Sequence, residues 1–149
     1  MARPVAHALG EYPHARQVTT RWMDNDAYGH VNNVVHYSYF DTVVNDWLIR
    51  QGLLDVEKGA VIGLVVETGC HYFESLTYPE TVTAAMRVAH VGNSSVRYEI
   101  ALFGEGRNKA AAQGHFVHVY VDRNTRRPTT LTDAWRRALA TITVGAGVR

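Results

Sequence analysis

Cysteine is nearly absent from this chain of 149 residues, and its scarcity limits the possible classes of protein. Cys70 is the only cysteine, so no internal disulfide can form. A chain without disulfides is typical of a reducing compartment. No apolar run approaches the ~20 residues needed to span a bilayer, and no apolar signal core follows Arg3. We therefore expect a cytoplasmic protein.

An excess of either charge is also missing. Fifteen Lys and Arg residues face fourteen Asp and Glu residues, which gives a net charge of +1. This balance predicts no general attraction to nucleic acids or membrane surfaces. Hydrophobic residues make up 46% of the chain, and there is no internal repeat or low-complexity segment. The sequence thus indicates one globular domain with a substantial core.

Several common catalytic motifs are missing as well. There is no HExxH motif and no cysteine pair, and His115 and His118 would face opposite sides of a strand. We therefore expect no metal site. The serines lack a Gly-x-Ser-x-Gly setting, and glycine-rich phosphate loops are absent. Cys70 lies among apolar strand residues, which favours an inert core thiol over a nucleophile.

Hydrophobic periodicity predicts an α+β fold. A short strand is followed by a long helix, four strands and a short helix, over residues 18–22, 34–51, 60–75, 81–91, 95–104, 110–122 and 135–140. Short turns between the later strands imply antiparallel pairing. The pattern therefore predicts a five-stranded antiparallel sheet that wraps around the long central helix. We expect residues 1–15 to be a flexible arm, 16–140 a single domain and 141–149 a flexible tail.

Two predicted faces carry most of the expected core. The helix should bury a wide apolar stripe made of Tyr37, Phe40, Val44, Trp47, Leu48 and Gln51. In the strands, the expected inward residues are Val82, Ala84, Met86, Val88, Val96, Tyr98, Ile100 and Leu102. Along the strand over residues 60–75, one face should hold Ile62, Leu64, Val66, Thr68, Cys70 and Tyr72.

The most distinctive stretch connects the first strand to the long helix. Within ten positions it holds Asp24, Asn25, Asp26, Gly29, His30, Asn32 and Asn33. Any one of these residues is ordinary in a turn or a helix cap. Together they exceed what one turn requires. The N-terminus of the following helix also offers unpaired N–H groups that suit an oxygen gaining negative charge.

The run Asp24-x-Asp26-x-x-Gly29-His30-Val31-Asn32-Asn33, followed by Tyr37, Phe40 and Asp41, resembles the signature of a known family. The family is the 4-hydroxybenzoyl-CoA thioesterase family of hotdog-fold acyl-CoA thioesterases. The resemblance extends more weakly over residues 16–128. It implies a hotdog fold, a homodimer or homotetramer in which the sheets of two subunits join, and an active site at their interface.

The resemblance also implies roles for individual residues. It places the catalytic carboxylate at Asp26, as a base or a nucleophile, and the amide that polarises the thioester carbonyl near Asn33. Gly29 would let the backbone approach the ligand, and N–H groups around Asn32 and Asn33 would form the oxyanion hole. His30 either orients the thioester or a water molecule, or packs within the loop. Asp24 is interpreted as structural, bonded to the backbone or to Arg21.

Substrate contacts follow less directly from the sequence. The expected substrate-binding residues are Tyr28, Tyr37, Ser94, Ser95 and Arg97. The two tyrosines either line a pocket or belong to the core. The run Gly92-Asn93-Ser94-Ser95 resembles a turn that lies beside the pantetheine arm in this family. The candidates for binding the coenzyme A phosphates are Arg87, Arg97, Arg123, Arg126 and Arg127.

These observations predict an acyl-CoA thioesterase that releases a free acid and coenzyme A. Coenzyme A belongs to the substrate, so no separate cofactor or metal is needed, and an acyl-carrier protein is an alternative carrier. Two other hypotheses stay open. One is a hotdog hydratase or dehydratase acting on enoyl thioesters, and the other is a non-catalytic acyl-CoA-binding module. The sequence leaves the acyl group open.

Overall fold

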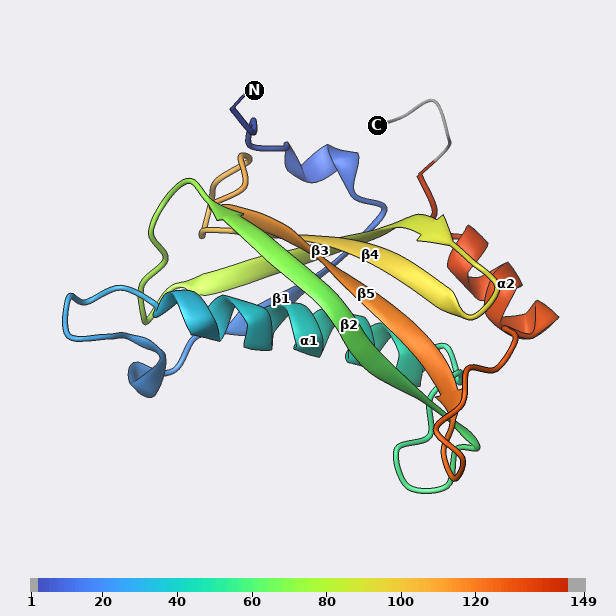
Figure 1. Cartoon of the computed structure of the whole chain (residues 1–149). Helices are drawn as coiled ribbons and strands as arrows, with labels where there is room; N and C mark the ends of the chain where they lie inside the picture. Colours follow the sequence, from blue (N-terminus) through green and yellow to red (C-terminus); the bar gives the residue numbers. More distant parts are fainter. Residues whose placement is uncertain (1–2, 145–149) are drawn as a thin grey trace.

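A long helix lies across one face of a five-stranded antiparallel sheet (Figure 1). The structure is a computed structural model that describes residues 3–144. The strands and α-helices are β1 (His14–Thr19), α1 (Asn33–Arg50), β2 (Val61–Tyr72), β3 (Thr81–Val91), β4 (Ser95–Phe103), β5 (Ala112–Asp122) and α2 (Asp133–Ala140). The strands follow one another across the sheet in the order β1-β3-β4-β5-β2. The predicted α+β fold class is thereby confirmed.

Alternation along β3 and β4 builds the core under α1. The predicted inward residues of these two strands are all fully buried: Val82, Ala84, Met86, Val88, Val96, Tyr98, Ile100 and Leu102. They pack with the buried face of α1 in one hydrophobic cluster. The period-two pattern of a strand therefore predicts this part of the core correctly.

The buried stripe of α1 is shifted from the predicted one. Phe40, Val44, Trp47 and Leu48 are buried as expected, but Gln51 lies just past the helix and is exposed. Tyr37 is only partly buried. The stripe also includes three residues that we did not predict, His36, Tyr39 and Val43. As expected, Gly52 follows the end of the helix, and its φ of 74° is the left-handed conformation that glycine adopts easily.

Strand β2 is one of the two edge strands of the sheet, and its middle is exposed. Leu64, Val65 and Val66 are 36%, 50% and 59% exposed. A bulge between Val65 and Glu67 shifts the register of β2 against β5. Because an extra residue moves all later side chains to the other face, the predicted single face from Ile62 to Tyr72 is wrong.

The N-terminal segment is attached to the sheet. A 3₁₀ turn, η1 (Leu9–Glu11), lies beside the β4–β5 connection, where the N–H of Leu9 donates to the carbonyl of Asn108 at 3.1 Å. Strand β1 begins at His14, before the predicted Val18, and it ends at Thr19 because the chain then turns into η2 (Trp22–Asp24).

At the other end of the chain, residues 141–144 follow α2. There the N–H of Val144 donates to the carbonyl of Val88 at 3.1 Å, so this part of the predicted tail is hydrogen-bonded to β3. The rest of that tail, residues 145–149, lies outside the described residues. Between residues 3 and 144, no helix has both the length and the apolar character needed to cross a membrane.

Candidate active site

Residues 25–31 form a closed loop between η2 and α1. Asn25 and Val31 make an isolated antiparallel bridge across its base. Inside the loop, the N–H of Asp26 donates to the carbonyl of His30 at 2.8 Å, and the N–H of Gly29 donates to the carbonyl of Asp26 at 3.1 Å. Gly29 has a φ of 80°, which a residue with a side chain rarely adopts. The backbone of the loop is therefore fixed by its own hydrogen bonds.

The segment before β3 holds this loop from outside. The hydroxyl of Thr77 donates to the carbonyl of Gly29 at 2.7 Å, and the N–H of Tyr78 donates to Oδ1 of Asn25 at 3.0 Å. The sequence predicts only a turn at residues 77–80. It carries no signal for these contacts, because they join positions about fifty residues apart.

Asp24 lies at the base of the loop and is only 1% exposed. Its carboxylate accepts hydrogen bonds from the hydroxyl of Tyr39 at 2.7 Å, from the N–H of Arg21 at 2.9 Å and from the Arg21 guanidinium at 3.0 and 3.1 Å. Burial alone would raise the pKa of Asp24, but these hydrogen bonds hold the pKa below its usual value. The expected pairing with backbone and Arg21 is confirmed, and Tyr39 is a partner that we did not predict.

Asp26 is placed quite differently from Asp24. It is partly exposed, and its Oδ1 accepts one hydrogen bond, from the N–H of Tyr28 at 2.8 Å. Within residues 3–144, its second carboxylate oxygen accepts none. Asp26 lines an open hollow of about 580 Å³ whose walls include Trp22 and Met23, which are 76% and 72% exposed. A carboxylate is thus presented to a space with apolar walls.

The start of α1 leaves one backbone donor open. The side chain of Asn32 caps the helix by accepting from the N–H of Val34 at 3.0 Å, and the N–H of Asn32 donates to the carbonyl of Asp24 at 2.9 Å. In the described part of the chain, the N–H of Asn33 has no partner. Of the two N–H groups that we expected in an oxyanion hole, that of Asn32 is already bonded, and only that of Asn33 is available. A further contact that we did not predict is the hydroxyl of Tyr72, which donates to the carbonyl of Asn33 at 3.0 Å.

Three other predicted site residues lie near this loop and helix start. The side chains of His30 and Tyr28 are exposed, Tyr28 by 85%, and His30 makes no side-chain hydrogen bond within residues 3–144. Tyr37 lies one turn into α1 and stacks on Phe116, with ring centroids 6.4 Å apart and planes 11° apart. The structure therefore brings Asp26, Tyr28, Gly29, His30 and Asn33 together around one loop and one helix end.

Ser94 and Ser95 lie at the end of the sheet that is opposite to the Asp26 loop. They follow β3 at the turn beside α2, whereas the Asp26 loop lies next to the start of β3 (Figure 1). An eleven-residue strand separates the two places, or roughly 33 Å at the usual rise per residue. Within one chain, neither serine lies beside Asp26.

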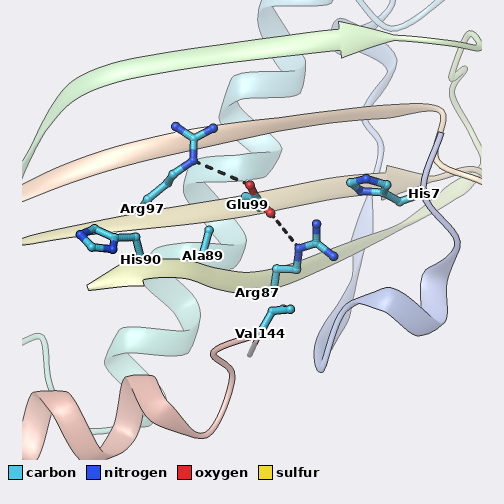
Figure 2. Close-up of a pocket in the computed structure, with 7 residues that line it drawn as sticks. All are labelled: His7, Arg87, Ala89, His90, Arg97, Glu99 and Val144. Atoms are coloured by element: carbon cyan, nitrogen blue, oxygen red, sulfur yellow. Dashed lines mark hydrogen bonds and ion pairs between the residues drawn. The ribbon is translucent and has the colours of Figure 1, made fainter. Parts of the chain in front are cut away.

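Arg97 belongs to the outer face of the sheet. Its guanidinium approaches Glu99 at 3.7 Å and Glu67 at 3.4 Å. Figure 2 shows Glu99 between Arg97 and Arg87, and Arg87 donates to it at 2.8 Å. Because α1 covers the other face, a group bound beside the Asp26 loop of the same chain does not meet Arg97.

The other candidate arginines divide into two groups. Arg87 is buried between Glu99 and the ring of Tyr12, and Arg123 donates to backbone carbonyls of residues 55, 56 and 59. Their guanidinium groups are therefore largely committed to the fold. Arg126 and Arg127 are exposed in the turn after β5. Among residues 3–144, no three His, Cys, Asp or Glu side chains are arranged to hold a metal ion.

Comparison with solved structures gives the same fold. The chain is 48% identical to the PA5185 protein of Pseudomonas aeruginosa strain PAO1, with a TM-score of 0.91 over 95% of this chain and 99% of that one. A DHNA-CoA thioesterase from Staphylococcus aureus is 21% identical, with a TM-score of 0.77 over 86% of this chain and 89% of that one. The second likeness shows the fold alone, which is the hotdog fold that the motif implies.

Comparison of sequences gives the family. The uncharacterized protein YsmA of Bacillus subtilis (strain 168) is 23% identical over 124 residues, which cover 83% of this chain and 82% of YsmA. The profile of the thioesterase-like superfamily matches residues 18–139, which is most of the chain. The resemblance found in the motif is thereby confirmed, and the chain belongs to the thioesterase-like superfamily.

Proposed function

We propose that this protein hydrolyses an acyl-CoA thioester to a free acid and coenzyme A. Two observations carry the proposal: Asp26 lines an open hollow on a loop fixed by hydrogen bonds, and this loop leads into α1, where the N–H of Asn33 has no partner among the described residues. Membership of the thioesterase-like superfamily supports this class of reaction. The relative from Staphylococcus aureus acts on a coenzyme A thioester, which supports the same carrier here.

The proposed reaction divides the work between these two groups. Asp26 either removes a proton from a water molecule that attacks the thioester carbonyl, or attacks the carbonyl itself to form an anhydride that water then opens. In both cases the carbon–sulfur bond breaks, and the thiolate of coenzyme A leaves and takes up a proton. The N–H of Asn33 and the positive end of the helix dipole stabilise the negative charge that develops on the carbonyl oxygen.

We further propose that two copies of the chain associate through β2. The strand has an unpaired edge, and three large apolar side chains in its middle are more than a third exposed. Such an edge favours pairing with another strand. Antiparallel pairing about a two-fold axis would lay the Val61 end of one β2 beside the Tyr72 end of the other. Tyr72 contacts Asn33, so the start of α1 in one protomer would lie next to the Val61 end of its partner.

The test is release of thiol from a panel of acyl-CoAs with short, long and aromatic acyl groups. The native protein should hydrolyse at least one of them, and Asp26→Asn should lose most of that rate. Asp133→Asn, which removes an equal charge from the exposed start of α2, serves as the matched control and should keep the rate. Native rates in Asp26→Asn would contradict the proposal. Tight binding without hydrolysis by the native protein would favour a binding module instead.

A further inference from the structure

The peptide bond between Asn32 and Asn33 carries the N–H group that the proposed reaction uses. The N–H of Asn33 and the carbonyl of Asn32 belong to one amide, so electron density drawn to the oxygen makes the N–H a stronger donor. That carbonyl makes two hydrogen bonds. It accepts from the N–H of Val35 at 2.9 Å, and Nδ1 of His36 lies 3.1 Å from it. His36 is therefore bonded directly to the amide that would hold the developing oxyanion.

The carbonyl of Asn32 decides which nitrogen of His36 carries the proton. A carbonyl oxygen can only accept, so Nδ1 must be protonated for this hydrogen bond to exist. Burial lowers the pKa of His36, so the ring is neutral at pH 7 and Nε2 then carries no proton. The imidazole is thereby fixed in a single tautomer, which donates to the backbone at the start of α1.

Two tyrosines hold the ring of His36 in place. His36 is only 3% exposed. Its ring meets that of Tyr72 edge to face, with centroids 5.0 Å apart, and lies 6.5 Å from the ring of Tyr39. Both tyrosines are themselves hydrogen-bonded, because the hydroxyl of Tyr72 donates to the carbonyl of Asn33 and that of Tyr39 donates to Asp24. The imidazole is therefore held in one orientation.

The start of α1 is already closed without the hydrogen bond of His36. The carbonyl of Asn32 accepts from Val35, and the side chain of Asn32 caps the helix by accepting from Val34 at 3.0 Å. A phenylalanine in place of His36 would fill the same buried space and leave no backbone group unpaired. Burying an imidazole instead costs free energy of desolvation. The extra hydrogen bond therefore points to a role in tuning the N–H of Asn33.

We propose that His36 is a positioning residue for the hydrolysis: its Nδ1–H fixes the plane of the Asn32–Asn33 amide and strengthens the N–H of Asn33 as a donor to the thioester carbonyl. The inference rests on the proposed function. As negative charge develops on the thioester oxygen, it polarises the amide further, and Nδ1–H of His36 stabilises the charge that shifts onto the oxygen of Asn32. Hydrogen bonds in a chain strengthen one another in this way.

The first test is His36→Phe, which keeps a buried ring beside Tyr72 and removes the donor. An oxyanion-hole donor contributes roughly 10²- to 10³-fold to kcat, so strengthening it by about 10–30% is worth roughly 2- to 8-fold. The kcat of His36→Phe should fall by that factor on the best acyl-CoA of the panel. KM should change by less than about twofold, because the effect belongs to the transition state. An unchanged kcat would overturn the proposal.

Two further variants separate positioning from folding. His36→Asn, whose amide can donate near the place of Nδ1, should recover much of the kcat lost in His36→Phe. His14→Phe is the matched control, because burial also lowers the pKa of His14, yet this residue lies on β1 and its Nε2 bonds nothing within residues 3–144. It should keep the native kcat. Equal losses of kcat in the two Phe variants, in step with losses of stability in urea, would overturn the proposal.

NMR of the free protein separates this inference from the proposed hydrolysis. Nitrogen NMR should show a protonated Nδ1 and an unprotonated Nε2 in His36. The amide nitrogen and proton of Asn33 should both move upfield in His36→Phe, because the amide is less polarised, and stay in place in His14→Phe. These signals need no turnover, so they support the coupling even if the native protein hydrolyses no thioester. The opposite tautomer, or an Asn33 signal that does not respond, would overturn the inference even if Asp26→Asn abolishes a real hydrolysis.

Discussion

The two ends of helix α1 differ in the side chains that surround them. Near its N-terminus, the partly exposed carboxylate of Asp26 lines a wide hollow, and the N–H of Asn33 has no partner within residues 3–144. At its C-terminal half, a smaller hollow is lined by His118 and Tyr120, and the buried hydroxyl of Tyr98 lies 2.8 Å from that of Tyr120. The helix has eighteen residues and so is about 27 Å long. One small acyl group cannot reach both places within one chain.

The two places could come together only between two chains, and the free edge of β2 offers a way for two chains to pair. Its two ends belong to the two sites, since Gly63 borders the smaller hollow and Tyr72 contacts Asn33 at the helix start. Antiparallel pairing of two β2 strands would bring unlike ends together. The helix start of each chain would then lie beside the hollow that Gly63 borders in the other chain.

The largest effect is expected from removing the carboxylate of Asp26 near the N-terminal end of α1. Asp26→Asn should lower kcat/KM by roughly 10²- to 10⁴-fold, which is the usual contribution of a positioned acid or base. The free energy of unfolding should change by less than about 0.5 kcal/mol, because Asn can still accept from the N–H of Tyr28. Thiol release and thermal unfolding measure the two effects. A large loss of stability would instead indicate a structural role.

The next largest effect is expected from disrupting the proposed pairing of two chains through β2. Val65→Lys places a charge at the half-exposed centre of the β2 edge and should convert the protein to monomers. If each site needs two chains, activity should fall by roughly 10²-fold as the dimer is lost. Sedimentation velocity and thiol release check this outcome. Val5→Lys, at a position that is 75% exposed, is the control. An active monomer would show that one chain is sufficient.

A smaller effect concerns the C-terminal end and depends on pH. Burial lowers the pKa of His118 to about 4 in the folded protein, below its usual value near 6.5. The unfolded chain therefore binds more protons between these values, so stability is full above pH 6.5 and falls as the pH drops towards 4. The loss at His118 should be about 3 kcal/mol.

Denaturant titrations from pH 7 to pH 4 can isolate this contribution. Burial also lowers the pKa of His14 and His36, so the native protein should lose stability through them in the same direction. The difference between native protein and His118→Phe is the part that belongs to His118. Equal pH slopes in the two proteins would mean that His118 is not held neutral.

Asp24→Asn tests the base of the active-site loop. The substitution removes the charge that accepts from Tyr39 and Arg21 and should cost about 2–3 kcal/mol of stability. Because the folded pKa of Asp24 is lowered, its contribution is present above the usual Asp range and is lost as the pH falls through the folded pKa. Urea titration at pH 7 and at pH 3 checks both points. An unchanged midpoint at pH 7 would contradict the role given to Asp24.

The smallest effect concerns Tyr72. Tyr72→Phe removes one hydrogen bond to the carbonyl of Asn33 from a side chain that is 43% exposed. We expect a loss of about 0.5–1 kcal/mol in stability, measured by urea unfolding. A loss several times larger would mean that Tyr72 supports more of the helix start than this one contact.

The sequence predicts the parts of the fold and of the candidate site that depend on a local pattern of residues. Alternation gives the buried residues of β3 and β4, and the motif gives the loop around Asp26. The bulge after Val65 has no local signal, because it depends on how β2 pairs with β5. The contact of Tyr39 with Asp24 joins two elements and is equally hidden. The hydrogen-bonded chain of His118, Tyr120 and Tyr98 joins β5 to β4, so the alternation along β5 alone does not predict it.

The most direct test of the account is thiol release from the acyl-CoA panel by the native protein, Asp26→Asn and Asp133→Asn, measured side by side. The account predicts that the native protein and Asp133→Asn hydrolyse at least one acyl-CoA and that Asp26→Asn loses most of that rate. A rate in Asp26→Asn equal to the native rate would contradict the account.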